Sequence, residues 1–470
     1  MSRLIVVSNR VADLSSGAQA GGLAVAIGDA LREGSGLWFG WDGRVVADGT
    51  EFGLSLARQD TVSVATQPLT QSEYDNYYLG HSNNLLWPIF HYRLDLAKYD
   101  GTALEIYKSV NARFAASLAA LIEPGDLVWI HDYHLIPMAA ELRKLGVTNK
   151  IGFFLHIPFP PPDMLSAAPE HDWLVETLFA YDLLGFQTQQ DCGNFALYLD
   201  REQCGRAVAA HVYEGFGRRV TARAFPIGID VDAFTGMART EKADKEIGKL
   251  SRGLPLTHII GVDRLDYSKG LPDRFRAFRR LMEMYPEHRK TAVLMQIAAP
   301  TREELVAYTD IRSELEQLSG AINGEFGDFD WTPVRYIHRP VPRDTLAALF
   351  RGSKVGLVTP LRDGMNLVAK EYVAAQDAED PGVLVLSQFA GAAEELQDAL
   401  IVNPYDTDEV AEALHRAMAM PPDERIARHT TLLAQVREHD IVTWRTAFLK
   451  TLREGLGTAQ DAPPKDGSAV

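Results

Sequence analysis

Short apolar runs alternate with amphipathic segments along most of the chain. In the first half these runs predict five strands, which are Arg3–Ser8, Leu127–His131, Ile151–His156, Leu183–Thr188 and Ala222–Ile227. Helical periodicity appears between them, for example over Leu135–Leu145 and Trp173–Leu184. Leu37–Gly43 (LWFGWDG) reads as an aromatic turn. Strands that alternate with helices indicate βαβ units and a mostly parallel sheet.

Residues 228 to about 255 interrupt the pattern, because polar and charged residues dominate and no strand is evident. A second series of strands follows at Ile259–Leu265, Ala292–Ala298, Val334–His338, Val355–Thr359, Val383–Ser387 and Leu400–Asn403. The helices expected there are Leu271–Tyr285, Glu303–Leu318, Leu367–Gln376 and a long segment from Asp423 to about Leu452. The fold class is therefore α/β, with two doubly wound parallel-sheet domains, residues 1–228 and 229–440, and a ligand cleft between them. Residues 456–470 are rich in Gly, Pro, Ala and Asp and are expected to be a disordered tail.

The stretch from Val355 to Gln376 is the centre of the candidate site. A buried strand runs through a Pro–Asp–Gly turn into a helix that Asn366 can cap. Such a junction points free N–H groups and the positive end of a helix dipole at one spot, which favours an anion. Glu371 lies one turn into the helix, where it can accept hydrogen bonds from a ribose. The alternative is an ordinary strand–turn–helix with a solvated Glu371.

Other strand ends also gather polar side chains. Arg264 and Lys269 flank a glycine-closed turn and can converge on a diphosphate; the alternative is an exposed loop that caps a helix. Asp132 follows one strand of the first half, His156 ends another, and Arg302 follows one of the second; a lone histidine is more often structural. Tyr78 and Trp87 can stack on a sugar ring, although an aromatic core is the commoner arrangement.

Composition excludes several classes of protein. Net charge is −16, which argues against a nucleic-acid or anionic-membrane surface but not against a local basic pocket. Two cysteines, no apolar run of membrane-spanning length and no signal-peptide pattern indicate a reducing, cytoplasmic location. Three DxD pairs begin at Asp230, Asp328 and Asp406; we interpret them as caps and turns, so we expect no metal and no cofactor.

Nine segments, taken together and in this order, resemble the trehalose-6-phosphate synthase family of retaining glycosyltransferases. They are Ser8–Arg10, Ala20–Ala24, Leu37–Trp41, Leu86–Arg93, Val128–Leu135, Gly152–Pro160, Leu183–Thr188, Val262–Pro272 and Thr359–Gln376. The resemblance covers nearly all of residues 1–455. It implies the GT-B architecture of two Rossmann-like domains with an active-site cleft between them. It also implies that a final helix, residues 441–455, packs back on the first domain.

The resemblance implies a role for each matching residue. Arg264 and Lys269 hold the donor diphosphate, Asp363 and Gly22 position the transferred glucose, and His156 contacts that glucose near the reacting carbon. Arg264, Lys269, His156 and Asp363 form the catalytic set. The donor-binding set adds Gly21, Gly22, Val341, Gly364, Met365, Asn366, Leu367, Val368, Ala369, Lys370 and Glu371. The acceptor-binding set is Arg10, Tyr78, Trp87, Asp132 and Arg302.

The implied reaction transfers glucose from a nucleoside-diphosphate glucose, UDP-glucose first, to glucose 6-phosphate, and gives α,α-trehalose 6-phosphate. These two sugars are the expected partners, and the sequence leaves homo-oligomer formation open. The alternatives are a sister transferase that makes glucosylglycerol phosphate or a pseudo-disaccharide phosphate, a nucleotide-sugar epimerase, and a non-catalytic sugar-phosphate sensor. The intact set of Arg10, Tyr78, Asp132 and Arg302 favours a phosphorylated hexose as the acceptor.

Overall fold

The computed structural model describes residues 3–12, 27–28, 31–32, 36–59, 61–250 and 256–455. Their contacts divide into two compact units. Unit 1 comprises the described residues up to Pro226 and from Trp444 onward, and unit 2 comprises Ile227–Thr443. The boundaries expected from the sequence were 228 and 440.

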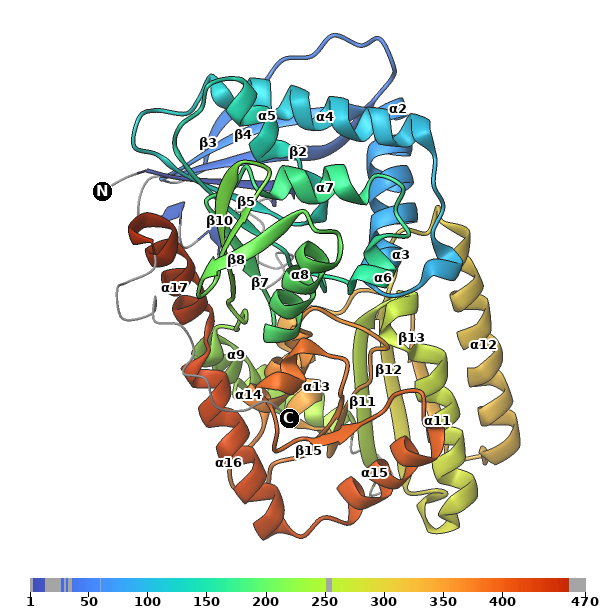
Figure 1. Cartoon of the computed structure of the whole chain (residues 1–470). Helices are drawn as coiled ribbons and strands as arrows, with labels where there is room; N and C mark the ends of the chain where they lie inside the picture. Colours follow the sequence, from blue (N-terminus) through green and yellow to red (C-terminus); the bar gives the residue numbers. More distant parts are fainter. Residues whose placement is uncertain are drawn as a thin grey trace. The chain divides into compact units, whose positions relative to one another are not determined.

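Unit 1 is built on a ten-stranded sheet in the order β3-β4-β2-β1-β5-β6-β7-β10-β9-β8 (Figure 1). Its strands are β1 Leu4–Arg10, β2 Leu37–Val46, β3 Ser55–Gln59, β4 Val62–Thr70, β5 Leu127–His131, β6 Lys150–Phe154, β7 Leu183–Phe186, β8 Gly205–Ala209, β9 Val212–Gly215 and β10 Arg218–Ala224. In this spatial order, every neighbouring pair between β4 and β10 is parallel. The edge strands β3, β9 and β8 pair antiparallel with their neighbours. The central strand β5 is fully buried, and β1 is buried over its first four residues, as expected for a sheet covered on both faces.

The helical elements of unit 1 connect these strands. They are α2 Gln71–Glu73, a π-helix η1 Tyr74–Leu86, α3 Trp87–Phe90, η2 Leu94–Leu96, α4 Gly101–Ala119, η3 Tyr133–Leu135, α5 Met138–Lys144, α6 Pro162–Leu165, α7 His171–Leu178 and α8 Gln189–Arg201. Asp100 caps α4 by accepting from the backbone N–H of Thr102, and Thr188 with Asp191 forms a capping box at the start of α8.

Three expectations for unit 1 are wrong. The strand expected over Ala222–Ile227 lies earlier, as β10, Arg218–Ala224. Leu37–Gly43 is not a turn but most of β2, because its aromatic side chains alternate between the two covered faces of the sheet, with Trp38 and Phe39 buried. The helix expected over Trp173–Leu184 ends at Leu178, and Leu183 already belongs to β7.

Unit 2 contains a six-stranded parallel sheet in the order β13-β12-β11-β14-β15-β16. The strands are β11 Thr257–Arg264, β12 Ala292–Ala299, β13 Val334–Ile337, β14 Val355–Val358, β15 Val383–Ser387 and β16 Leu400–Val402. All six were anticipated within two residues at each end, since each is a short run of apolar, often β-branched residues. The prediction of an α/β fold with two parallel-sheet domains is confirmed.

The helices of unit 2 form two groups (Figure 1). One group is α11 Leu271–Met284, α12 Val306–Phe326 and α15 Thr407–Ala419, and the other is α9 Val231–Ala238, α10 Glu241–Leu250, α13 Arg343–Arg351, α14 Leu367–Ala375 and α16 Pro422–Glu438. Short turns η4 Tyr267–Lys269, η5 Pro286–His288 and η6 Gly391–Glu394 complete the unit. The polar stretch after residue 228 is thus helical, and the long last helix is broken between α16 and α17, Ile441–Glu454.

Within unit 1, the later part of α17 packs against the sheet. The rings of Trp444 and Phe448 lie 5.0 and 4.7 Å from the ring of Trp129 in β5. A Cβ atom on Gly152 or Gly185 would come within 2.8 and 2.7 Å of the Phe448 ring, so the helix can approach these strands only because both positions are glycine.

Each unit has one point where the strand order reverses. In unit 1 the chain runs from β1 to β2 on one side and from β5 to β7 on the other, so the reversal lies between β1 and β5. In unit 2 it lies between β11 and β14. Doubly wound sheets bind ligands at the carboxyl ends of the strands beside such a reversal. The loops after β1, β5, β11 and β14 are therefore the first places to look for a site.

Candidate functional site

In unit 2, the two loops beside the reversal are joined by a nearly buried ion pair. Lys269, in the turn after β11, places its Nζ 2.6 Å from Oδ2 of Asp363 in the loop after β14, and the two side chains are 10% and 13% exposed. The backbone N–H of Leu361 donates to the carbonyl of Ser268 at 2.8 Å and ties the same loops together. Sequence reasoning chose both residues separately; the structure brings them into contact.

The remaining predicted cations of unit 2 lie at the same edge of the sheet. Arg264 is the last residue of β11 and its side chain is exposed. Arg302, in the loop after β12, donates from Nη1 to the hydroxyl of Tyr308 at 2.7 Å, and that hydroxyl donates to buried Asp266 at 3.1 Å. The pKa of Tyr308 is raised, mainly by burial and next by the Asp266 carboxylate. Neither Asp266 nor Tyr308 was singled out from the sequence.

A fully buried arginine joins three strand ends at this edge of the sheet. Arg274 of α11 donates to Asp263 at 2.7 Å, to Gln296 at 2.8 Å and to the hydroxyl of Thr359 at 3.1 Å. These partners belong to β11, β12 and the end of β14, so one guanidinium fixes three strand ends. A buried charge without such partners would be strongly destabilising. The network was missed because Arg274 looks like any surface arginine of an amphipathic helix.

The start of α14 differs from the expected capped helix. Asn366 is at the N-cap, but its backbone is left-handed (φ 75°) and its side chain makes no capping bond to the helix. Instead, its Nδ2 donates to Oδ2 of Asp363 at 3.0 Å. The prediction that the Asn366 side chain caps the helix is therefore wrong.

The side chains of the predicted donor stretch face different ways. Met365, Asn366, Ala369 and Lys370 are buried, whereas Leu367 and Val368 are half-buried. The Lys370 ammonium donates to the carbonyl of Ile227 at 2.8 Å and pairs with Glu395 at 2.5 Å, and burial lowers its pKa. Lys370 can therefore contribute its main chain to a nucleotide site, while its side chain holds the unit together.

Glu371 is held by an arginine that sequence reasoning missed. Nη2 of Arg343, from α13, lies 3.3 Å from Oε1 of Glu371, whose side chain is 15% exposed. Burial raises the pKa of Glu371, and Arg343 acts in the opposite direction. Val341 precedes α13 and is half-buried. The carboxylate keeps lone pairs for a second donor, such as a hydroxyl group.

In unit 1, Asp132 and His156 meet beside the reversal. Asp132 follows β5, and its Oδ1 accepts from the backbone N–H of His156 at 3.3 Å. Nε2 of His156 lies 3.0 Å from Nδ1 of buried His131, so one ring donates to the other. Burial lowers the pKa of His156 to about 3 and that of His131 well below its usual value. Both imidazoles are therefore neutral at physiological pH, and the bond between them couples the proton position of one ring to that of the other.

A second cluster of unit 1 surrounds the end of β1. The guanidinium of Arg10 lies 5.8 Å from the ring centroid of Trp41, and that ring lies 5.6 Å from Tyr78. Tyr78, in the π-helix, also stacks on His134, which follows β5, at 5.8 Å. A π-helix has a wider turn than an α-helix, and π-helical turns are frequent at functional sites. Tyr78 lies in such a turn. Trp41 and His134 therefore contact predicted acceptor residues, and neither was singled out from the sequence.

Trp87 lies deeper than the sugar-stacking prediction supposed. It is 4% exposed, and its ring packs on His91 at 4.1 Å and Tyr133 at 5.6 Å. The face of the Trp87 ring is therefore covered and cannot stack on a sugar. The place of Trp87 in the acceptor set stays a prediction. Gly21, Gly22 and the tail 456–470 lie outside the described residues.

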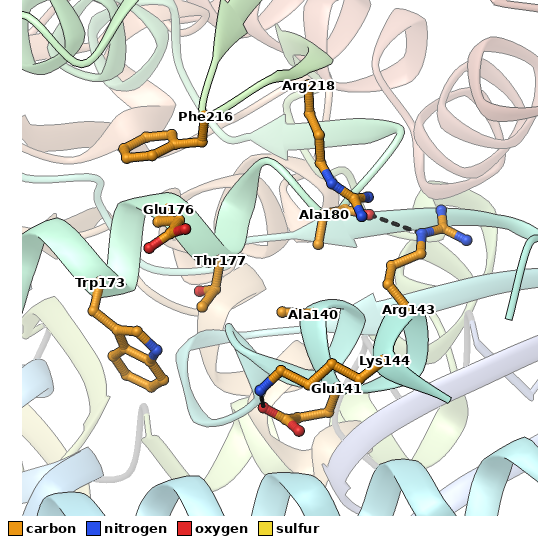
Figure 2. Close-up of a pocket in the computed structure, with 10 residues that line it drawn as sticks. All are labelled: Ala140, Glu141, Arg143, Lys144, Trp173, Glu176, Thr177, Ala180, Phe216 and Arg218. Carbon is orange, nitrogen blue, oxygen red and sulfur yellow. Dashed lines mark hydrogen bonds and ion pairs between the residues drawn. The ribbon is translucent and has the colours of Figure 1, made fainter. Parts of the chain in front are cut away.

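The surface hollow drawn in Figure 2 is not part of either cluster. Its volume is about 430 Å³, and it lies in unit 1 between α5, α7 and the β9–β10 hairpin. Lys144 is paired with Glu141 at 2.7 Å, and Arg143 already donates to Ala180 and Asp182. None of the predicted residues lines it, so we assign it no role in the chemistry.

The DxD pairs behave as caps and turns, as expected. Asp230 caps α9 and Asp406 caps α15, each by accepting backbone N–H groups of the first turn. Asp328 accepts from the N–H of Phe329 and pairs with Lys290. Across the ranges that the structure describes, no helix is long and apolar enough to cross a membrane.

Comparison with known proteins gives one consistent answer. The sequence profile of glycosyltransferase family 20 matches residues 5–454. Trehalose-6-phosphate synthase of Klebsiella pneumoniae is 51% identical over 457 residues, which cover 96% of this chain and 95% of that protein.

Two solved structures extend the comparison to bound substrates. One is an α,α-trehalose-phosphate synthase (UDP-forming) from Burkholderia xenovorans in complex with glucose 6-phosphate; it is 51% identical, has a TM-score of 0.92, and the match covers 96% of this chain and 100% of that one. The other, from E. coli, is bound with UDP-2-fluoro glucose; it is 47% identical, has a TM-score of 0.92, and the match covers 97% and 100%.

Proposed function

The chain belongs to glycosyltransferase family 20, and on that premise we propose that it transfers glucose from UDP-glucose to O1 of glucose 6-phosphate. The bond between glucose C1 and the β-phosphate oxygen breaks, and a bond from C1 to O1 of the acceptor forms. The acceptor hydroxyl gives its proton to the departing phosphate. Because the α configuration of the donor is kept, the products are α,α-trehalose 6-phosphate and UDP.

The ion pair between Lys269 and Asp363 is the observation that carries this proposal. It fixes a cation and a carboxylate beside the reversal of strand order in unit 2, where a doubly wound sheet binds its ligand. With Arg264 at the end of the same strand, β11, Lys269 stabilises the charge that develops on the leaving diphosphate. Asp363 accepts hydroxyl groups of the transferred glucose, and Glu371 accepts those of the ribose.

The acceptor is proposed to bind to the residues around the reversal of strand order in unit 1. Arg10 and Tyr78 supply donors for its phosphate, and Asp132 accepts from a sugar hydroxyl. His156, neutral and oriented by His131, donates or accepts at the reacting sugar. Catalysis of this kind depends on positioning and electrostatics rather than on a covalent intermediate.

The proposal extends to partners and location. We propose no cofactor and no metal for the reaction, since Arg264 and Lys269 neutralise the diphosphate directly. The net charge of −16 supports the absence of a nucleic-acid partner. Cys192 and Cys204 are free thiols, which supports a reducing, cytoplasmic location.

A donor-by-acceptor screen tests the function. UDP-, GDP- and ADP-glucose are each combined with glucose 6-phosphate, glucose or glycerol 3-phosphate, and the product is identified by NMR. We expect UDP-glucose with glucose 6-phosphate to give a disaccharide phosphate with two α-anomeric protons. Consumption of UDP-glucose without an acceptor would indicate an epimerase, and a glycerol product would indicate the sister transferase; either result contradicts the proposal.

A further inference from the structure

Three potential metal ligands meet on unit 2 away from the residues discussed so far. Glu287 and His288 lie in the turn η5, and His415 lies in α15. Nε2 of His288 is 2.9 Å from Nδ1 of His415, which is 4.0 Å from Oε1 of Glu287. The side chains of His415 and Glu287 are 34% and 60% exposed, so an ion can reach them from solvent. We call these three residues the His–His–Glu cluster.

The backbone and the neighbouring rings hold the His–His–Glu cluster in place. In η5, the N–H of His288 donates to the carbonyl of Tyr285, and the carbonyl of His288 accepts from the N–H of Thr291. The Tyr285 ring lies parallel to the His415 ring with centroids 3.9 Å apart. Helices α11 and α15 pack together and are bridged by Arg280 and Asp408 at 2.6 Å. A site whose ligands are fixed in this way loses little conformational entropy when it binds an ion.

The chemistry of the donor set favours a borderline divalent transition metal. Two imidazoles and one carboxylate suit Zn²⁺, Ni²⁺ or Cu²⁺ and not Mg²⁺, which prefers oxygen ligands and water. With metal–nitrogen bonds of about 2.0–2.1 Å, two nitrogens bound at a right angle are about 2.9 Å apart, and about 3.4 Å apart in a tetrahedron. The observed 2.9 Å lies at the short end of this range, and a bound ion would replace the hydrogen bond that now joins the two rings.

We propose that Glu287, His288 and His415 bind one divalent ion of the zinc, nickel and copper group, which clamps η5 to α15. The cluster precedes β12, whereas Arg302 follows it, and a strand of eight residues spans roughly 25 Å. The ion therefore lies at the edge of the sheet opposite the proposed donor site. Its role is to stabilise unit 2, and the transfer reaction does not involve it.

Zinc titration of the full chain, produced without a polyhistidine tag and stripped with a chelator, tests the proposal. We expect equilibrium dialysis to show one tightly bound Zn²⁺ per chain and no binding of Mg²⁺ at the same concentration. His415→Gln is expected to weaken zinc binding at least tenfold. At a hundredfold excess of Zn²⁺ over its dissociation constant, the wild-type melting temperature should rise by about 3 °C or more, and that of His415→Gln should not.

Two further variants separate this site from other histidines and from a folding defect. His211→Asn alters a histidine of unit 1 whose left-handed backbone (φ 61°) asparagine tolerates, and it should bind zinc as the wild type does. Glu287→Gln changes an exposed side chain and should weaken zinc binding while leaving the metal-free melting temperature unchanged. Zinc binding that is equal in wild type, His415→Gln and Glu287→Gln would overturn the proposal, as would the absence of stoichiometric zinc in the wild type.

Discussion

Three of the predicted site residues have a positive φ angle, a backbone conformation that costs free energy in residues with a side chain. Asp132 (φ 75°), Arg302 (φ 48°) and Asn366 (φ 75°) all lie directly after strands or at a helix start, in a region that favours glycine. Such conformations cost of order 1–3 kcal/mol each and persist where the surroundings over-determine them. In each case the side chain is fixed by contacts: Asp132 to the N–H of His156, Arg302 to Tyr308, and Asn366 to Asp363. Three of the eight described non-glycine residues with positive φ are thus predicted binding residues.

The first prediction at the scale of single residues concerns the contacts of Arg264 and Lys269 with the donor diphosphate. Arg264→Ala and Lys269→Ala should each lower kcat about 30- to 1000-fold, because a charge-assisted contact in the transition state is worth roughly 2–4 kcal/mol. Lys354→Ala is the matched control: Lys354 precedes β14 at its amino end, pairs with Asp380 at 3.9 Å, and should keep wild-type kcat. Steady-state kinetics and melting temperatures measure both effects. Near-wild-type turnover of either active-site variant would refute the assignment, and an activity loss in EDTA that Mg²⁺ restores would revive a metal-dependent reaction.

The ribose contact is a second prediction at this scale. Glu371→Gln should weaken nucleotide binding by roughly 1–2 kcal/mol, since a carboxylate that accepts from hydroxyls is replaced by a neutral amide. A 2′-deoxyribose donor should lose a similar amount with the wild type and much less with the variant. Calorimetric titration of both nucleotides against both proteins completes a double-mutant cycle. Losses that simply add would show that Glu371 does not touch the ribose.

At the scale of elements, His131 at the end of β5 and His156 just after β6 form a histidine pair that makes stability depend on pH. The folded pKa of His156 is about 3, below the ordinary 6.5 that it regains on unfolding. Between these values the unfolded chain binds the proton and the folded chain does not, so stability falls as pH falls from 7 towards 3. Between pH 7 and 5 the loss should be roughly 1–2 kcal/mol for this group. Urea denaturation of wild type and His156→Asn at both pH values should show the smaller change in the variant; an equal change would contradict the shifted pKa.

The elements also show why some features were predictable and others were not. The parallel strands of unit 2 were found because each buried strand is a short uniform apolar run. The strand β2 was missed because its Trp, Phe and Gly residues resemble a turn, and only burial on both faces reveals it. Arg274, His131 and Arg343 were missed because their importance lies in partners on other elements, such as Asp263, His156 and Glu371. A sequence specifies such partners only through the completed fold.

At the scale of the whole molecule, the two units share one arrangement. Each sheet reverses its strand order once, and each reversal carries residues that the sequence singled out: Arg10 and Asp132 in unit 1, and Lys269 and Asp363 in unit 2. A doubly wound sheet leaves its ligand loops free to differ while the strands stay fixed. One unit can therefore bind the donor and the other the acceptor with the same underlying fold.

Recognition of the acceptor phosphate is the prediction that draws on both units. Arg10 of unit 1 and Arg302 of unit 2 are both predicted to bind it, each contact being worth on the order of 2–3 kcal/mol. Free glucose lacks the phosphate, so its kcat/KM should be roughly 10³-fold or more below that of glucose 6-phosphate. Part of the loss should appear in kcat, because binding energy from the phosphate also serves the transition state.

The variant Arg302→Ala isolates the contribution of unit 2. It should lower kcat/KM for glucose 6-phosphate steeply, change the already low value for glucose little, and leave UDP binding nearly intact. The melting temperature must be followed as well, because the substitution also removes the bond to Tyr308 beside buried Asp266. Tyr308→Phe is the matched control, since it breaks the same bond but keeps the guanidinium; it should retain the preference for glucose 6-phosphate. If the wild type uses glucose and glucose 6-phosphate with equal efficiency, the acceptor assignment is wrong, and trehalose 6-phosphate is no longer the expected product.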